Sequence, residues 1–269
     1  MAIRVLLRGG GDLASGVVLR LVRCGFQVAV AELPEPLAVR RAVAFAEVVF
    51  RGEFKIEEVV GRRIENPQEI PALIQENIVP VVIDPRVELR HTWPPDVVVD
   101  GRMIKRPPEA GNIDLAPLVI GLGPGSTAGV DCHAIVETMR GHSLGRVYWT
   151  GSAEKDTGLP EAVHNFQAER VLRAPAAGVL QNYKQIGDLV QEGETISSVN
   201  GIAIQAKFPG VLRGLLKEGL PVHEKMKIGD LDPRMDTRMV TKVSDKALAI
   251  GGGVLEAILS NPAMRVKLT

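Results

Sequence analysis

The stretch from Ile3 to Glu32 constrains the fold more than any other part of the chain. A short apolar run, Ile3–Leu7, breaks into a glycine turn, and a second apolar run, Phe26–Ala31, ends at Glu32. Between the two runs lies a segment with an apolar face that ends at Gly25, as helices commonly do. Strand, glycine turn, helix and strand in this order predict a βαβ unit with two parallel strands. Later strands alternate with helical segments, so we predict a Rossmann-like, mostly parallel α/β sheet.

The glycine turn after the first run matches the pattern G-x-G-x-x-A at Gly9, Gly11 and Ala14. In dinucleotide-binding proteins, such glycines let the backbone approach a pyrophosphate, and an acid after the second strand accepts from ribose hydroxyls. Glu32 occupies the position of that acid. The predicted cofactor-binding residues are therefore Gly9, Gly10, Gly11, Asp12, Ala14, Ser15, Gly16 and Glu32. The alternative is a βαβ unit whose glycines serve only tight packing of helix against strand.

Three charged residues near this turn allow two interpretations each. Asp12 would repel a phosphate at the start of the helix, although it could equally be the N-cap. Arg40 and Arg41 could neutralise a phosphate, and we include them in the predicted ligand site. They could instead line a solvated helix face that follows Pro36.

A second glycine loop follows the apolar strand Pro117–Leu122 in the middle of the chain. Cys132–Met139 alternates in polarity and is rich in β-branched residues, which predicts a strand with His133 and Glu137 on one face. Four residues along a strand span about 13 Å, so these two side chains are too far apart to share one ion, and we predict no metal.

Two functions remain for the side chains of this central stretch. A histidine near carboxylates can move protons at neutral pH, so the candidate catalytic residues are His133, Glu137 and His142. A histidine is also commonly a structural hydrogen-bond partner, and whether the protein is an enzyme stays open. Gly123, Gly125 and Arg140 are predicted to hold a small anionic ligand, because backbone N–H groups and a guanidinium both suit phosphate or carboxylate. The alternative is a strand turn that needs glycine for packing.

An internal repeat begins near Arg173. Ala174–Leu180 matches Ala206–Leu212 at an offset of 32, and Gly187 and Val190 match Gly219 and Val222 at the same offset. Between the halves lies Asn200–Gly201, the dipeptide most typical of a two-residue hairpin. Two similar β units joined by a tight hairpin predict a small all-β barrel-sandwich hybrid domain, which resembles the biotinyl/lipoyl carrier domains. The hairpin tip holds no lysine, so we predict a scaffold or docking element in place of a carrier.

The tail predicts a short helical segment. Ser244 is a plausible N-cap, Gly251–Gly253 predicts a break, and Val254–Leu259 predicts a second short helix. A segment this short must pack back on another domain. The predicted domains are 1–115 (Rossmann-like), 116–170 (central β/loop segment), 171–234 (barrel-sandwich) and 235–269 (C-terminal helical segment).

Composition excludes several classes of protein. Lys+Arg and Asp+Glu are both 32, whereas a nucleic-acid-binding protein usually has a basic excess. No apolar run approaches the ~18 residues of a membrane span, and the N-terminus lacks a secretory pattern. The 2 cysteines, Cys24 and Cys132, form no disulfide framework, which favours the cytoplasm.

Five segments together carry a resemblance that covers nearly the whole chain. They read GGGDLASG, ELPEPLAVRRAVAF, IGLGPGSTAGVDCHAIVETMRGHSLGRV, KIGDLDPR and SDKALAIGGGVLEAIL. The set resembles the YqeB-type accessory proteins of selenium-dependent molybdenum hydroxylase systems, and the N-terminal part is similar to the Rossmann domain of XdhC-type insertion factors. Ser126 departs from this pattern, where a bulky aromatic residue would be expected.

The resemblance implies a maturation factor whose partner is a molybdenum hydroxylase or one of its maturation proteins. The implied ligand is a nucleotide, a dinucleotide or a molybdopterin cofactor. Two other functions stay open, an NAD(P)-dependent oxidoreductase and a docking adaptor without ligand. The oligomeric state is also open, a homo-oligomer included.

Overall fold

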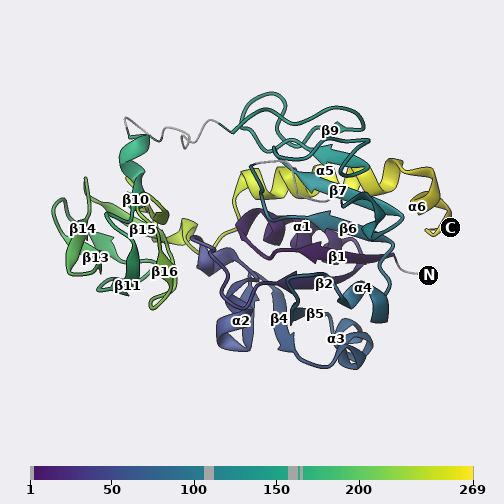
Figure 1. Cartoon of the computed structure of the whole chain (residues 1–269), viewed down its shortest axis with the longest axis horizontal. Helices are drawn as coiled ribbons and strands as arrows, with labels where there is room; N and C mark the ends of the chain where they lie inside the picture. Colours follow the sequence, from purple (N-terminus) through teal and green to yellow (C-terminus); the bar gives the residue numbers. More distant parts are fainter. Residues whose placement is uncertain (1–2, 106–111, 157–162, 164–165, 269) are drawn as a thin grey trace. The chain divides into compact units, whose positions relative to one another are not determined.

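The computed structural model describes residues 3–105, 112–156, 163 and 166–268. The chain divides into two compact units (Figure 1). Unit 1 comprises Met1–Pro36, Ala44–Thr157 and Val243–Thr269, and unit 2 comprises Leu37–Val43 and Gly158–Lys242. Within the described ranges, no helix has the length and apolar character that crossing a membrane requires.

Unit 1 is built on a sheet of 9 strands in the order β3-β4-β5-β2-β1-β6-β7-β8-β9. The strands from β4 to β8 in this order are parallel to one another. The two edge strands, β3 and β9, pair antiparallel with their neighbours. The strands are β1 (Arg4–Arg8), β2 (Gln27–Glu32), β3 (Glu53–Ile56), β4 (Val59–Ile64), β5 (Ile78–Ile83), β6 (Val97–Asp100), β7 (Leu118–Leu122), β8 (Ala134–Val136) and β9 (Val147–Tyr148).

The predicted βαβ unit is present, because β1 and β2 are parallel and α1 connects them. The helices of unit 1 are α1 (Asp12–Arg23), α2 (Glu47–Arg51), α3 (Ile70–Gln75), α4 (Leu89–Thr92), α5 (Asp245–Ser260) and α6 (Pro262–Val266), with 3₁₀ turns at Pro67–Glu69 and Ile113–Leu115. Asn66 caps the first of these 3₁₀ turns by accepting from the Gln68 N–H.

The predicted fold class is wrong in two respects, and the first concerns this sheet. It is mixed, because a two-residue connection at Glu57 and Glu58 turns β3 back against β4, with Ile56 opposite Val59. Glu57 adopts a φ of 52° there, a conformation that the sequence does not signal, since hairpin turns usually place Asn or Gly at such positions. The predicted boundary after residue 115 also lies inside the sheet, where β6 pairs with β7.

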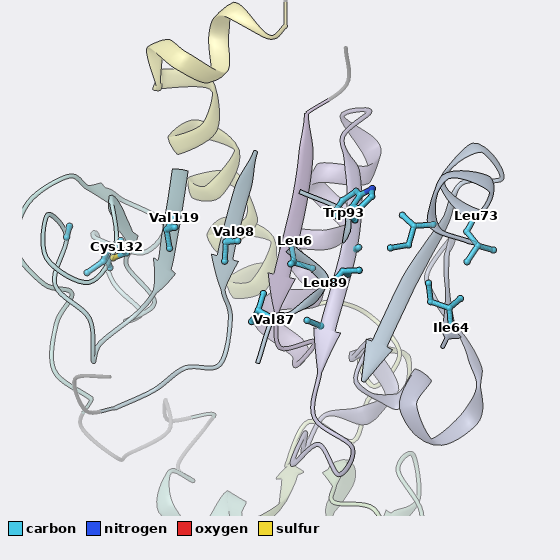
Figure 2. Packing of buried hydrophobic residues seen from close by; sticks show 14 of the residues in the cluster. Leu6, Ile64, Leu73, Val87, Leu89, Trp93, Val98, Val119 and Cys132 are labelled. Carbon is cyan, nitrogen blue, oxygen red and sulfur yellow. The ribbon is translucent and has the colours of Figure 1, made fainter. Parts of the chain in front are cut away.

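A buried apolar cluster covers one face of the sheet (Figure 2). Leu6, Val98 and Val119 contribute from the central strands, and Leu89 and Trp93 contribute from α4 and the residue after it. Burying each such side chain stabilises the fold by about 1.5–3 kcal/mol. Because side chains alternate between the faces of a strand, the residues on either side of these point to the opposite face.

The opposite face carries α1 and α5, which pack against each other (Figure 1). A Cβ atom on Gly16 of α1 would lie 2.4 Å from the Ala247 carbonyl oxygen of α5. A Cβ on Gly253 of α5 would lie 2.2 Å from the Gly145 carbonyl oxygen. The predicted break at Gly251–Gly253 is therefore wrong: α5 is continuous, and its glycines allow close approach of neighbouring backbone. The predicted N-cap is confirmed, since the Ser244 side chain accepts from the Ala247 N–H.

Unit 2 holds two antiparallel sheets of 4 strands each, in the orders β10-β17-β15-β12 and β14-β13-β11-β16. They replace the predicted small barrel-sandwich hybrid domain, which is the second correction to the fold class. The strands are β10 (Val171–Arg173), β11 (Gly178–Asn182), β12 (Leu189–Val190), β13 (Thr195–Val199), β14 (Ile202–Gln205), β15 (Gly210–Leu215), β16 (Pro221–Val222) and β17 (Lys227–Asp232), with 3₁₀ turns at Arg41–Val43, Ala168–Arg170 and Thr237–Met239.

The internal repeat is visible in the strand pairing of unit 2. In one pair Gly178 of β11 lies opposite Val222 of β16, and in the other Gly210 of β15 lies opposite Val190 of β12. Each residue of the first pair is matched in the second at the sequence offset of 32, so the repeats pair reciprocally. The predicted hairpin is also confirmed, because Asn200 and Gly201 connect β13 to β14 with positive φ values of 50° and 77°.

Candidate functional site

The order in which strands are added to the unit 1 sheet reverses between the parallel neighbours β1 and β6. β2 lies on one side of β1, whereas β6 and β7 lie on the other, so the segments that follow β1 and β6 diverge. In open α/β sheets, ligands bind at the carboxyl ends of the strands that flank such a point. Arg8 ends β1 and Asp100 ends β6, and the two residues are in register.

Arg8 and Asp100 project from the face that carries Leu6 and Val98, because each lies two residues beyond one of them. Asn112 bridges the two side chains. Its Oδ1 accepts from Arg8 Nη1 at 3.0 Å, and its Nδ2 donates to Asp100 Oδ2 at 3.2 Å. Asp100 and Asn112 are both buried.

Arg102 neutralises Asp100 directly. Its Nε and Nη2 donate to the two carboxylate oxygens at 2.9 and 2.6 Å. Asp84, after β5, is likewise committed, since its oxygens accept from the backbone N–H groups of Glu88 and Leu89 at 2.9 and 2.8 Å. Both buried carboxylates near Arg8 are thus held by other donors.

The edge of the Arg8 guanidinium formed by Nε and Nη2 has few hydrogen-bond partners. The Nε atom is buried and has no hydrogen-bond partner in the described part of the chain. On the same edge, Nη2 reaches only the Pro85 carbonyl oxygen, at 3.4 Å. Burial and the nearby charge of Arg102 lower the pKa of the Arg8 guanidinium. A buried donor atom without a hydrogen-bond partner requires a physical explanation.

The predicted glycine-turn site has a different environment. The Ala46 N–H donates to the Gly10 carbonyl oxygen at 2.9 Å, and the Phe45 N–H donates to Ser15 Oγ at 2.9 Å. A Cβ atom on Gly10 would lie 2.9 Å from Ala46 N. Gly10 and Ser15 are therefore in contact with the segment Phe45–Ala46, whereas a Cβ on Gly11 would meet no atom within 4 Å.

Glu32 does not present a free carboxylate to a ligand. Its oxygens accept from the N–H groups of Gly10 and Leu33 at 2.6 and 2.7 Å. Burial raises the pKa of the Glu32 carboxyl, although these two hydrogen bonds act in the opposite direction.

The remaining residues of the predicted turn site have structural contacts. Gly11, and not Asp12, is the N-cap of α1, and Asp12 lies in the first turn. Ala14 packs close to Gly101, where a Cβ would lie 2.8 Å from the Ala14 Cβ. Gly9 has a φ of 93° and Gly16 contacts α5.

Arg40 and Arg41 belong to unit 2, whereas the glycine turn belongs to unit 1. Arg40 Nη2 donates to the Lys242 carbonyl oxygen at 3.2 Å, and Arg41 Nε donates to the Leu215 carbonyl oxygen at 2.8 Å. Both side chains contact backbone of their own unit.

The central stretch is mostly structural. Glu137 is fully buried, and its carboxylate accepts from the N–H groups of Thr138, Met139 and Glu154 at 2.7, 2.7 and 2.8 Å. His133 precedes β8, which spans only Ala134–Val136 of the longer predicted strand, and its Nδ1 accepts from the Val119 N–H at 2.9 Å.

The predicted anion grip of this stretch also has internal partners. Arg140 forms two hydrogen bonds with Asp245 at 2.8 and 2.7 Å. A Cβ on Gly123 would lie 2.4 Å from Thr138 Oγ1, so this glycine serves packing, and Gly125 has a φ of 106°. His142 is exposed and contributes its carbonyl oxygen to Arg146.

Two further observations bear on chemistry. No group of three His, Cys, Asp or Glu residues that could hold a metal occurs among the residues the structure describes. Burial raises the pKa of the Cys132 thiol to about 11, which disfavours the reactive thiolate.

Sequence reasoning missed Arg8, Asp100, Arg102 and Asn112. A signal existed for two of them, since Arg8 and Asp100 each stand between a buried strand and a glycine turn. No comparable signal pointed to Asn112, which lies 104 positions from Arg8.

Comparison with known proteins yields one close relative. No family model matches the chain. The chain is 46% identical to the uncharacterized protein YqeB of Escherichia coli strain K12 over 266 residues, which is 98% of this chain. It spans about half, 49%, of the length of that relative.

Solved structures match only distantly. They include an aspartoacylase family protein from Mesorhizobium loti (12% identity, 86% of this chain and 85% of the other, TM-score 0.28). A succinylglutamate desuccinylase/aspartoacylase from Rhodobacter sphaeroides matches at 14% identity over the same shares, with a TM-score of 0.28. Likeness at this level carries no inference about activity.

The predicted role in maturation of a selenium-dependent molybdenum hydroxylase is corrected by these findings. The relative that the chain matches is named only as uncharacterized, so the role is withdrawn. A nucleotide, dinucleotide or molybdopterin ligand on the glycine turn stays a prediction: Ala46 and Phe45 contact Gly10 and Ser15, but Gly11 has no such neighbour. The docking adaptor was inferred from a barrel-sandwich domain, which the two antiparallel sheets replace.

Proposed function

We propose that unit 1 binds a small anion, a carboxylate or a phosphate group, at the carboxyl ends of β1 and β6. The open Nε–Nη2 edge of Arg8 supports this proposal most directly. A guanidinium binds an oxyanion best through two parallel N–H groups, and this edge supplies such a pair.

The charges around Arg8 are mixed, since the carboxylates of Asp100 and Asp84 act on its pKa in the direction opposite to Arg102. Arg8 forms no hydrogen bond with Asp84 or Asp100, because backbone N–H groups and Arg102 already occupy those carboxylates. A small ligand is favoured, since Ala46 and Phe45 contact Gly10 and Ser15 of the neighbouring glycine turn. We also propose the cytoplasm as the location of the protein, because Cys24 and Cys132 are both free thiols.

Isothermal titration calorimetry on the full chain tests the proposal, with inorganic phosphate, acetate and NAD as probes. We expect phosphate or acetate to bind and NAD to bind no more tightly than phosphate. Arg8→Gln should weaken the binding by about tenfold or more, since it removes a charge-assisted hydrogen bond. Arg8→Lys should weaken it too, because an ammonium has no planar fork.

Arg4→Gln is the matched control. Arg4 lies on the same strand and the same face as Arg8 but at the amino end, and its removal changes the net charge equally. Its variant should bind the anion as the native protein does. Equal weakening in both variants would reduce the effect to net charge, and no binding of phosphate or acetate at millimolar concentration would refute the proposal.

A further inference from the structure

Unit 2 contains a buried cluster of charged side chains on the sheet β10-β17-β15-β12. Asp230 and Asp232 lie two residues apart on β17 and are 5% and 2% exposed. Arg170 precedes β10, Arg213 belongs to β15, and Arg234 follows β17. The arginines therefore approach the carboxylates from three different segments.

Arg213 reaches this cluster through an irregularity in the strand pairing. Leu212 of β15 lies opposite Leu231, but Gly214 lies opposite Asp230, so the register shifts at Arg213. A β-bulge of this kind leaves the extra residue unpaired and redirects its side chain. Bulges are over-represented beside functional sites, where they aim a particular side chain.

The partners of Asp232 are already assigned. Arg234 donates to its two oxygens through Nε at 2.9 Å and Nη2 at 2.6 Å, and the Arg234 N–H adds a third bond at 3.1 Å. Burial alone would raise the pKa of the Asp232 carboxyl, but the hydrogen bonds from Arg234 and the charges of Arg234 and Arg170 lower it to about 2. Asp232 is thus a saturated carboxylate.

Arg213 forms ion pairs with both carboxylates but no hydrogen bond to either. Its Nη1 lies 3.7 Å from Asp230 Oδ2 and 3.8 Å from Asp232 Oδ2, both beyond hydrogen-bond distance. Its Nε is buried, and within the described ranges it has no hydrogen-bond partner. The Arg213 side chain is 16% exposed and retains a donor without a hydrogen-bond partner.

We propose that Arg213 binds a carboxylate monoanion on unit 2, at a site separate from Arg8. The chemistry follows from the fork of the guanidinium, whose Nε and Nη2 can donate to the two oxygens of one carboxylate. The two aspartates set the tolerated charge. A dianion such as phosphate at neutral pH would meet twice the repulsion from Asp230 and Asp232 that a carboxylate meets.

Hydrogen–deuterium exchange with mass spectrometry on the full chain locates the binding. Saturating acetate should slow exchange several-fold in peptides that cover Gly210–Leu215 and Lys227–Asp232. The protection should persist in Arg8→Gln, which separates this site from the one proposed on unit 1, and should disappear in Arg213→Gln. Phosphate should protect these peptides at least severalfold less than acetate does.

Arg173→Gln is the matched control for Arg213→Gln. Arg173 is exposed on the neighbouring strand β10 and donates to the Lys225 carbonyl oxygen at 3.0 Å. Its variant should keep the acetate protection. Arg213→Lys, which preserves the charge and the fold, should lose most of the protection. Three results would overturn the proposal. They are acetate protection that survives in both Arg213 variants, a lack of acetate protection in the native protein, and equal protection by phosphate.

Discussion

The three consecutive glycines of α5 provide a sharp test of the packing described for unit 1. Alanine at Gly252 would meet no atom within 4 Å, whereas alanine at Gly253 would place its Cβ 2.2 Å from the Gly145 carbonyl oxygen and 2.7 Å from Val136 Cγ1. Replacing glycine by alanine inside a helix gains about 1 kcal/mol when space is available. Gly252→Ala should therefore raise the free energy of unfolding by about 1 kcal/mol, or Tm by about 2–4 °C for a unit of this size.

Gly253→Ala should have the opposite effect, because a backbone carbonyl has to move to admit the new methyl group. Overpacking costs about 1–3 kcal/mol, and contact with backbone places this case at the upper end. After the helix-propensity gain, a net loss of about 2 kcal/mol remains, so the two neighbouring variants should differ by about 3 kcal/mol.

Urea unfolding followed by tryptophan fluorescence measures this difference. Trp93 and Trp149 both lie in unit 1, which also contains α5. Far-UV circular dichroism should give the same midpoints if the unit unfolds in a single transition. Equal stability of the two variants would refute the close packing of α5 against the Gly145 backbone, and a loss in Gly252→Ala would refute the continuous helix.

Three further outcomes follow from buried groups. Asp232→Asn should destabilise unit 2 by about 2 kcal/mol above pH 5, because folding lowers the pKa of the Asp232 carboxyl from 3.8 to about 2. The difference in stability from the native protein should shrink as the pH falls towards 2, which unfolding measured at a series of pH values would show. Iodoacetamide should label the exposed Cys24 at neutral pH and leave the buried Cys132 unmodified until the protein unfolds, as peptide mass mapping would show. Equal labelling rates at the two cysteines would contradict the burial of Cys132. Glu137→Gln should lower the free energy of unfolding by about 2–4 kcal/mol, because an amide NH₂ then faces a backbone N–H, and a thermal melt unchanged from the native one would exclude this role.

Sequence patterns identified the local elements but not what approaches them. The sequence predicted close backbone approach at Gly9–Gly11, where Gly10 meets a neighbouring segment, but it predicted a helix break at Gly251–Gly253, through which α5 continues. In the first case the approaching group is the segment Phe45–Ala46, and in the second it is the neighbouring backbone of unit 1. Glycine removes a Cβ for a ligand and for a helix in the same way, so the residue type alone does not distinguish them.

The candidate site depended on long-range contacts that local patterns do not encode. Asn112 bridges Arg8 and Asp100 across segments far apart in the chain. Glu137 and Arg140 have the composition of a functional site, yet Glu137 binds three backbone N–H groups and Arg140 pairs with Asp245. The hairpin at Asn200–Gly201 was predictable because turn chemistry depends on adjacent residues. The repeat was predictable because matching residues at a constant offset are visible in the sequence itself.

Because each repeat pairs with the other at matched positions, unit 2 resembles a symmetric dimer whose two copies are joined in one chain. In a dimer of identical chains, every contact occurs twice and a change in one copy is imposed on the other. Once both copies lie in one chain, each can diverge alone. At the offset of 32, Asn200 is equivalent to Asp232. Gly178 lies against the Asn200 side chain at the hairpin tip, and Gly210 lies against the Asp232 backbone. One repeat has a hairpin turn at this position, while the other has a carboxylate that forms ion pairs with the arginines of unit 2.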